Sequence, residues 1–317
     1  MRWQITPEKE IWIENLVFDE QYCTLFPDFY FLLSGGADQD EILNAFPEYD
    51  TVQLKKFIAR LRLAHVLTDH IQPPFELFAA QGRLFQPARD LPEDYFMNAD
   101  HVAAYRRASL ERGSAESAGR CIELRGIAAD GGAYAKRRSV RCFCESEAIS
   151  MADFTEFLRV FMQFDDGSEF PRYPYPSAGG LYPIDCYVHI KPERVAGIAA
   201  GLYRLDTVKR RLIYVSAGSH ITKECHNYVN KEIFTSSAFS LHLIYDAGVS
   251  MPKYGAKAYY YAMLDAGIMT GYLYQKTAEM QLGCCSIGDL KFDRMEEDFC
   301  LTENQVWLHT IEVGIPV

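Results

Sequence analysis

The stretch YPYPSAGGLYP, from Tyr173 to Pro183, combines three prolines with two adjacent glycines among aromatic residues. Proline restricts the backbone and removes a hydrogen-bond donor, whereas glycine lets another surface approach the backbone closely. The alternating run CYVHI at 186–190 follows and predicts a strand. The sequence therefore predicts a turn with bare backbone N–H groups, against which a flat ring system can lie. An ordinary β-turn is the alternative interpretation.

The chain from Tyr134 onward alternates strand and helix patterns. Four runs predict strands, the first two as a hairpin: GLYRLD (201–206), RLIYVS (211–216), SLHLIYDA (240–247) and VWLHTIEVG (306–314). Ser150 and Asp153 form a capping pattern before a helix face that runs from Phe154 to Met162. Residues 258–282 predict a helix that is apolar nearly all round and therefore buried. An antiparallel-rich sheet with a buried central helix is an α+β fold.

The first part of the chain predicts a separate small domain. Residues 1–72 resemble a winged-helix unit, in which an apolar strand-like run, FYFLL (29–33), precedes two helices. DQDEILNAF (38–46) begins with a capping box, and TVQLKKFIARLRL (51–63) repeats apolar residues at helical spacing. Residues 73–132 are rich in turn signals and predict a connector with one helix near 99–112. The larger domain then spans 133–317.

Composition limits the class of protein. The 317 residues include 49% apolar side chains and support a substantial core, while the net charge of −11 disfavours a nucleic-acid partner. The N-terminal MRWQITPEKE has charges where a signal peptide needs an apolar core, and no apolar segment approaches the length of a membrane span, so we expect a cytoplasmic protein without a membrane partner. The nine cysteines have no CxxC pair and the histidines no ligand spacing, which predicts reduced thiols and no metal site.

The stretch KRRSVRCF, from Lys136 to Phe143, places four cations and a serine within six residues. Arginine offers a planar fork of donors that suits a phosphate or the polar edge of a flavin, and serine adds a hydroxyl. A solvated basic turn is the alternative interpretation of this stretch by itself.

Taken together, these stretches resemble the FMN-dependent nitroreductase fold, and within it the SagB-type azoline oxidases. The run PSAGGLYP, followed by a strand and then GLYRLD, is similar to the signature of that branch. The longer form, YPYPSAGGLYPIDCYVHIKPERVAGIAAGLY, is most similar to the thiazoline oxidases that serve nonribosomal peptide synthetases. The resemblance extends from Lys136 to the C-terminus.

The resemblance implies three groups of FMN-binding residues. The cationic motif would hold the phosphate and the pyrimidine side of the ring: Arg137, Arg138, Ser139 and Arg141. The turn would lie beneath the isoalloxazine: Pro176, Ser177, Ala178, Gly179 and Gly180. A loop would face flavin N5: Ile287, Gly288 and Asp289. The chain departs from the family in having no cation after Arg294, which places more of the phosphate binding on the Arg137 motif.

The resemblance also implies a catalytic pair, Lys253 and Tyr254, directly before the central helix. Tyr254 would be the base and Lys253 would assist it, since a neighbouring ammonium stabilises a phenolate. The alternative is that Tyr254 packs at the helix start while Lys253 faces solvent. The adjacent Cys284 and Cys285 are interpreted as small residues in a strand, because vicinal cysteines close a disulfide only with strain.

The implied activity is oxidation of a thiazoline or oxazoline in a peptide to the aromatic azole, with reduced FMN returned to its oxidised form by dioxygen. The resemblance implies a homodimer with FMN at the interface. The N-terminal unit is similar to a peptide clamp that could dock a peptidyl carrier protein or a precursor peptide. Two alternatives are an NAD(P)H-dependent nitroreductase or quinone reductase on the same fold, and a noncatalytic scaffold subunit.

Overall fold

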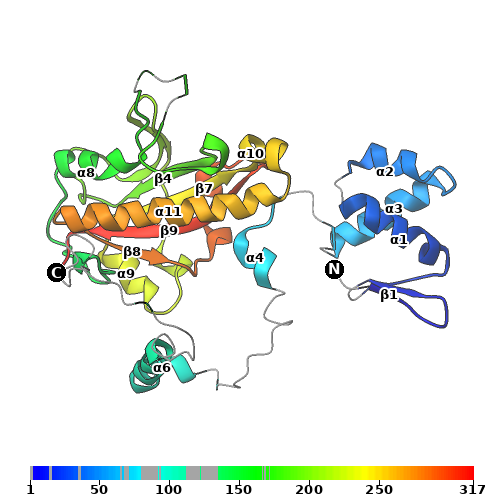
Figure 1. Cartoon of the computed structure of the whole chain (residues 1–317). Helices are drawn as coiled ribbons and strands as arrows, with labels where there is room; N and C mark the ends of the chain where they lie inside the picture. The colour runs from blue at the N-terminus through cyan, green and yellow to red at the C-terminus, as the bar shows by residue number, and fades with distance from the viewer. Residues whose placement is uncertain are drawn as a thin grey trace. The chain divides into compact units, whose positions relative to one another are not determined.

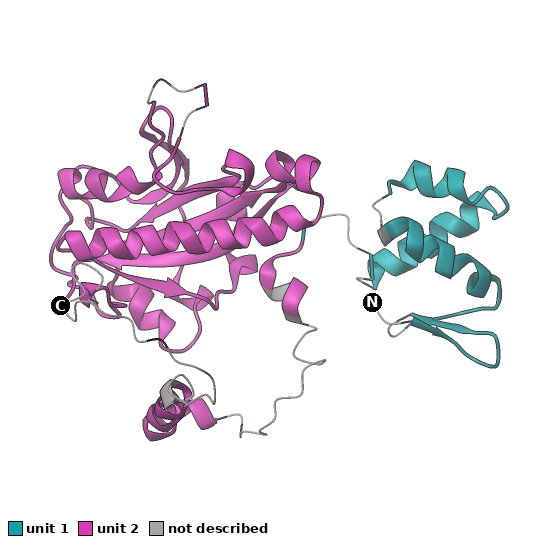
Figure 2. Ribbon diagram, in the orientation of Figure 1, with its two compact units in different colours: residues 1–71 teal, residues 72–317 magenta. Residues whose placement is uncertain are grey.

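The structure, a computed structural model, divides into two compact units, 1–71 and 72–317 (Figure 2). It describes residues 3–13, 16–34, 37–64, 66–67, 71–79, 92, 94–111, 122, 135–165, 167, 169–170 and 172–317. Most of the expected connector, 73–132, therefore lies outside the described residues. Within it, α4 (Pro74–Ala79) and α6 (Ala99–Glu111) are described, and α6 matches the predicted helix.

The first unit is a three-stranded antiparallel sheet followed by three helices. The strands, in the order β1-β2-β3, are β1 (Trp3–Ile5), β2 (Ile11–Ile13) and β3 (Leu16–Phe18). The helices are α1 (Gln21–Ser34), α2 (Gln39–Ala45) and α3 (Thr51–Leu63). Apolar side chains from all three helices and from β2 and β3 form its core. The resemblance of this unit to a winged helix stays a prediction.

The strand predicted at 29–33 is wrong, because these residues are the second half of α1. Leu25, Phe26 and Phe29 are at most 1% exposed and lie at helical spacing, so they form one buried face. Phe31, between them and the helix end, is 78% exposed. A short apolar run cannot by itself distinguish a strand from a buried helix, and here the residues upstream of the run complete a helical period.

The predicted helix starts of this unit are confirmed. The Asp38 carboxylate accepts a hydrogen bond from the Glu41 N–H at 2.8 Å, and the Glu41 side chain accepts one from the Asp38 N–H at 2.9 Å. This reciprocal capping box satisfies two N–H groups that would otherwise lack partners at the start of α2. The second helix, α3, spans the same residues as the predicted one, 51–63.

The second unit contains a six-stranded antiparallel sheet in the order β6-β5-β4-β7-β9-β8 (Figure 1). Its strands are β4 (Ile184–Ile190), β5 (Gly201–Asp206), β6 (Arg211–Ser216), β7 (Phe239–Asp246), β8 (Gly283–Ile287) and β9 (Gln305–Gly314). The predicted hairpin and the three other predicted strands are confirmed. The proline- and glycine-rich stretch at 173–183 leads directly into β4. Strand β4 pairs with β7, which is nearly all buried.

Helix α11 (Lys257–Glu279) lies across one face of this sheet, as Figure 1 shows. Thr277 of α11 contacts Cys284 of β8, whereas the next residue, Cys285, packs in a cluster with Ile233 of α9 (Asn230–Ser236). Because successive strand residues point to opposite faces, α11 and α9 cover opposite faces of the sheet. The mixed helix and antiparallel-sheet architecture confirms the predicted α+β fold.

Two predicted helices differ in extent. Ser150 caps α8 (Met151–Leu158) by accepting from the Asp153 N–H at 3.0 Å, but the α-helix ends at Leu158 and a 3₁₀ turn, Arg159–Phe161, replaces its last part. The central helix ends at Glu279, and one of its faces is exposed rather than buried all round. No helix in the part of the chain that the structure describes is long and apolar enough to cross a membrane.

Candidate functional site

The turn at 178–180 has the backbone shape that its glycines predict. A single 3₁₀ turn spans Ala178–Gly180, with φ of 65° at Gly179 and 66° at Gly180. L-residues rarely adopt this left-handed conformation, whereas glycine does so without steric cost. Two residues after Gly180, the bulky Tyr182 also has a positive φ, of 50°. Such outliers persist where the surrounding structure determines them, and they concentrate at functional sites.

A buried carboxylate on α11 holds the start of this turn. The Ser177 hydroxyl donates to Asp265 Oδ2 at 2.6 Å, and the Ala178 N–H donates to the same oxygen at 3.3 Å. The Ser177 oxygen also accepts from the Tyr182 N–H at 3.0 Å. Burial raises the pKa of Asp265, and the bonds from Ser177 and Ala178 partly offset that rise. Because the single hydroxyl hydrogen of Ser177 is already used in the hydrogen bond to Asp265, the Ser177 oxygen can interact with a ligand only as a hydrogen-bond acceptor.

The predicted catalytic pair packs against the turn at Gly179. Lys253 and Tyr254 end α10 (Ala247–Tyr254), immediately before α11. A Cβ at Gly179 would collide with the Tyr254 hydroxyl and lie 2.9 Å from Lys253 Nζ, so both polar groups contact bare backbone there. The Lys253 ammonium lies 5.0 Å from the centre of the Tyr254 ring. The structure thus joins two segments about 75 residues apart that the sequence identified separately.

The predicted cationic motif lies along β8. Ser139 bridges in parallel to Cys284, and the Tyr274 hydroxyl of α11 lies 3.1 Å from Ser139 Oγ while it accepts from the Ser286 N–H at 3.0 Å. The Arg137 guanidinium lies 5.6 Å from the centre of the Tyr274 ring. One tyrosine therefore ties the motif to the strand that leads into the predicted N5 loop.

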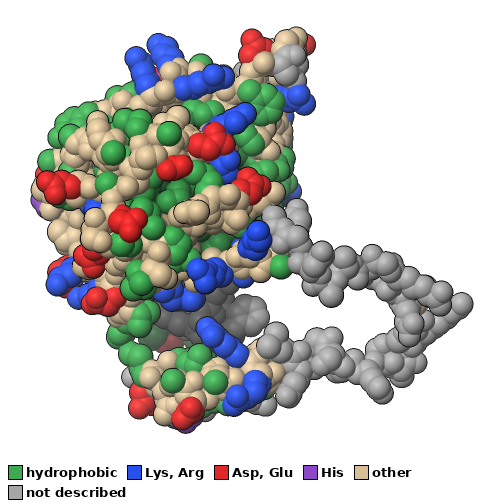
Figure 3. Space-filling view, turned by 90° about the vertical axis from the view of Figure 1, so that its left-hand side faces the viewer, with side chains coloured by type: hydrophobic (Ala, Val, Ile, Leu, Met, Phe, Trp, Pro, Cys, Tyr) green, Lys and Arg blue, Asp and Glu red, His purple; other side chains and the backbone are tan. Residues whose placement is uncertain are grey.

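The arginines of this motif have no acidic partners among the residues that the structure describes. None of Arg137, Arg138 and Arg141 forms an ion pair with any residue that the structure describes. Arg138 instead lines a cavity of about 490 Å³, together with Lys136 and the end of α11. Figure 3 shows that Lys and Arg side chains gather in patches on one face of this unit despite the acidic composition of the chain. Unpaired guanidinium groups are suited to an anionic ligand.

The predicted N5 loop follows β8 at Ile287. Apart from the chain neighbours, no heavy atom of the described residues lies within 4 Å of the position that a Cβ would occupy at Gly288, and the same holds at Gly180. The Asp289 carboxylate accepts a hydrogen bond from Asn227 Nδ2 at 2.7 Å, which fixes the loop to the segment before α9. Two features of the described residues therefore fit FMN. Two of the predicted flavin-contact glycines, Gly180 and Gly288, face open space, and the arginines of the cationic motif lack ion-pair partners within the described part of the chain.

Sequence reasoning missed three side chains that shape the site: Asp265, Tyr274 and Asn227. Asp265 had a detectable signal, because it is a lone carboxylate in the middle of an apolar helix. Tyr274 is one of several tyrosines in that helix, and its role depends on which face meets β8. Asn227 has no motif around it, and only the fold brings it to the loop.

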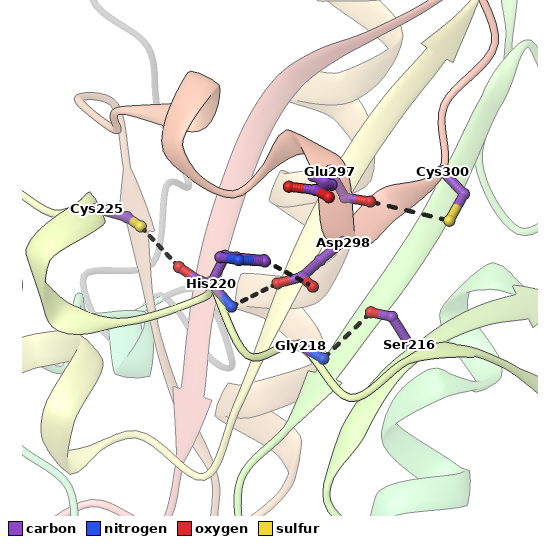
Figure 4. Close-up of polar contacts among 7 residues, drawn as sticks. All are labelled: Ser216, Gly218, His220, Cys225, Glu297, Asp298 and Cys300. Atoms are coloured by element: carbon purple, nitrogen blue, oxygen red, sulfur yellow. Dashed lines mark hydrogen bonds and ion pairs between the residues drawn. The ribbon is translucent and has the colours of Figure 1, made fainter.

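Cys225, Cys284 and Cys285 do not form an alternative reactive centre with the residues that the structure describes. Cys284 is buried, and burial raises the pKa of its thiol to about 12, while the pKa of Cys285 is also raised. Figure 4 shows Cys225 beside His220 and Asp298, but the Cys225 sulfur contacts the His220 carbonyl oxygen at 3.2 Å and not the imidazole. An activated thiol needs an adjacent base, which this arrangement lacks. The described residues also contain no cluster suited to a metal.

Comparison with known proteins bears on the family of this chain. A protein of Methanocaldococcus jannaschii that is named as a nitroreductase is 25% identical over 155 residues, which cover 48% of this chain and 75% of that protein. A chain of the Escherichia coli microcin synthetase McbBCD complex, solved with truncated pro-microcin B17, covers 86% of this chain and 96% of its own at 18% identity and a TM-score of 0.54. A nitroreductase structure from Ralstonia eutropha covers 62% and 88% at 19% identity and a TM-score of 0.45. The model of the nitroreductase family matches residues 134–315, more than half of the chain, and the chain therefore belongs to this family of oxidoreductases.

Proposed function

We propose that this protein is an FMN-dependent azoline oxidase. Its substrate would be a thiazoline or oxazoline within a peptide, which it would convert to the aromatic azole with dioxygen as the final electron acceptor. The observation that carries the proposal is the contact of Tyr254 and Lys253 with the bare backbone of Gly179, next to the open space at Gly180. The group proposed to accept the proton therefore contacts the same turn that is proposed to support the flavin ring.

The chain's own residues would bind the cofactor and move a proton. Arg137, Arg138 and Arg141 would neutralise the FMN phosphate and contact the pyrimidine edge, and the turn from Pro176 to Gly180 would support the ring. FMN, when bound, would supply the acceptor for the hydride that leaves one azoline carbon. Tyr254 would take the proton from the neighbouring carbon. The ammonium of Lys253 would stabilise the negative charge on the phenol oxygen.

The test is turnover of a defined substrate in air. We expect the purified protein to carry FMN and to remove two hydrogen atoms from a carrier-bound peptidyl thiazoline, with release of hydrogen peroxide. Tyr254→Phe should retain FMN and lose about 100-fold or more in kcat, because positioned proton transfer contributes at least that much. A Tyr254→Phe enzyme of normal activity would remove this residue from the mechanism.

A homodimer across α11 is part of the proposal. Apolar side chains that recur every four residues form an exposed stripe on this helix: Tyr260, Leu264, Ile268 and Tyr272. Gly267 and Gly271 lie exposed along the same stretch, where a Cβ would meet nothing within 4 Å. A helix face with large apolar residues beside glycines suits close packing against a second copy. That copy would cover the stripe and complete the FMN site.

The first unit is proposed to dock the substrate carrier. On α3, four cations are exposed, and none forms an ion pair with a described residue: Lys55, Lys56, Arg60 and Arg62. Arg60 stacks over Phe18 at 4.3 Å, which leaves the other three directed to solvent. Such a face would attract an acidic peptidyl carrier protein or precursor peptide by electrostatic complementarity. Binding that weakens steeply with salt would support this role.

A further inference from the structure

We propose that Asp265 is a positioning residue for the flavin and for the catalytic pair. It would act through the turn at 177–180, which it holds at Ser177 and Ala178 while Tyr254 contacts Gly179. This inference rests on the proposed function of that turn.

Folding alone does not explain a carboxylate at this position. Asp265 is 5% exposed and sits in the middle of α11, among apolar neighbours. Taking a charged group out of water is costly, and an apolar residue of similar size is often neutral or stabilising at such a place. The hydrogen bonds that the structure gives to Asp265 both come from the turn, one from Ser177 and one from Ala178.

The turn needs such a restraint. Gly179 and Gly180 both have positive φ, and two adjacent glycines leave a free chain many other conformations. Tyr182 is held in the left-handed region, where the Ser177 oxygen accepts from its N–H at 3.0 Å. The Asp265 carboxylate, the Ser177 hydroxyl and the Tyr182 N–H therefore form one chain of hydrogen bonds that fixes both ends of the turn.

The restraint reaches the catalytic pair because the turn contacts residues of two helices, α10 and α11. Asp265 holds it from α11, and the Tyr254 hydroxyl and Lys253 ammonium contact Gly179 from the end of α10. A shift of the turn would move the bare backbone at Gly180 relative to the ring that it is proposed to carry. The same shift would alter the position of Tyr254 relative to that ring. Asp265 therefore acts on binding and on proton transfer together.

The experiment measures FMN affinity and turnover for Asp265→Ala, Asp265→Asn and Ser177→Ala. We expect Asp265→Ala to weaken FMN binding by about tenfold or more, since each lost bond has a charged acceptor. At saturating FMN its kcat should fall while KM for the azoline changes little. Asp265→Asn, which keeps an acceptor oxygen, should recover most of the affinity. Adding Ser177→Ala to Asp265→Ala should cost little more, because both changes break the same chain.

Asp298→Ala is the matched control. Asp298 is 6% exposed and also ties down a turn, accepting from the His220 N–H at 2.7 Å (Figure 4), and it bonds to none of the proposed site residues. We expect this variant to melt at a lower temperature and to bind FMN as the wild type does. If wild-type protein binds FMN and Asp265→Ala matches the control in affinity and kcat, Asp265 is only structural. If Asp265→Ala does not fold, Ser177→Ala decides, because it breaks the link between Asp265 and Tyr182: weakened FMN binding supports the proposal, and wild-type affinity overturns it. Wild-type protein that binds no FMN would instead refute the proposed function.

Discussion

Gly179 is the residue at which the proposed flavin floor and the proposed base meet. Gly179→Ala places a methyl group against Tyr254 and Lys253 and requires a left-handed alanine at a φ of 65°. The backbone strain should cost about 1–2 kcal/mol of folding free energy. Displacement of the pair should lower azoline turnover by about 100-fold. Steady-state kinetics and urea unfolding measure the two effects.

Gly197→Ala separates strain from displacement. Gly197 has a φ of 78°, and a Cβ there would meet only Met151 Cε at an ordinary 3.6 Å. This variant should lose similar folding free energy and keep its turnover. Equal loss of activity in both variants would show that Gly179 matters only for stability.

At the scale of single residues, the sequence predicted the groups but not their partners. The arginine motif, the glycine turn and the Lys253-Tyr254 pair could each be identified from adjacent residues. Asp265 could not be paired with Ser177, because 88 residues separate them and only the packing of α11 on the turn brings them together.

At the scale of elements, α11 carries a prediction about assembly. Leu264 is 49% exposed at the centre of the apolar stripe, so Leu264→Glu should place a charge in the proposed dimer interface. We expect the dimer to dissociate and FMN to be lost with it. Analytical ultracentrifugation and the flavin absorbance of the purified protein measure both.

Val208→Glu is the control for Leu264→Glu, because it places the same charge on an exposed apolar residue away from α11. Val208 is 59% exposed at the tip of the β5–β6 hairpin, so a charge there should leave the dimer intact. Dimers that persist in Leu264→Glu at micromolar concentration would place the interface on another surface.

Helices and strands were predictable where the periodic pattern of apolar residues extended over many residues or where a capping residue marked the helix start. The capping box at Asp38 and the alternation in β4 gave the correct elements. The strand prediction at 29–33 was wrong because five consecutive apolar residues are compatible with both the strand period and the helix period. The buried Leu25 and Phe26 upstream show that the period is that of a helix. Full burial of α11 was overpredicted, since an apolar residue has the same identity in the sequence whether the fold buries it or leaves it exposed, as it does Leu264.

At the scale of the whole molecule, buried histidines predict acid sensitivity. Burial lowers the pKa of His226 to about 3 and that of His189 to about 4, and the pKa of His242 lies well below its ordinary value. The unfolded chain binds protons near pH 6.5. As the pH falls below about 6.5, the unfolded state therefore takes up protons that the folded state does not. The free energy of unfolding should fall, by at most about 1.4 kcal/mol per pH unit for each histidine.

His226→Phe tests this contribution. Both ring nitrogens of His226 are buried without a hydrogen-bond partner, and the ring stacks on Phe234 at 4.5 Å, so phenylalanine preserves the packing. Between about pH 4 and 6.5, the free energy of unfolding, measured with urea, should fall less steeply with decreasing pH than in wild type. The difference in slope should equal the contribution of a single histidine. The exposed His101→Phe should leave the decline unchanged. Buried acids such as Glu312 act in the opposite direction, but they are common to all three proteins and cancel. An unchanged slope in His226→Phe would show that this residue does not control acid stability.

The central claim is that an azoline, and not a nicotinamide, delivers electrons to flavin in this site. The direct measurement is the visible absorbance of the FMN-loaded protein under anaerobic conditions after addition of either a peptidyl thiazoline or NADH. We predict that the thiazoline bleaches the flavin and yields one thiazole per FMN, whereas NADH leaves the spectrum unchanged. Rapid bleaching by NADH, with no response to the thiazoline, would contradict the account and indicate a reductase on the same fold.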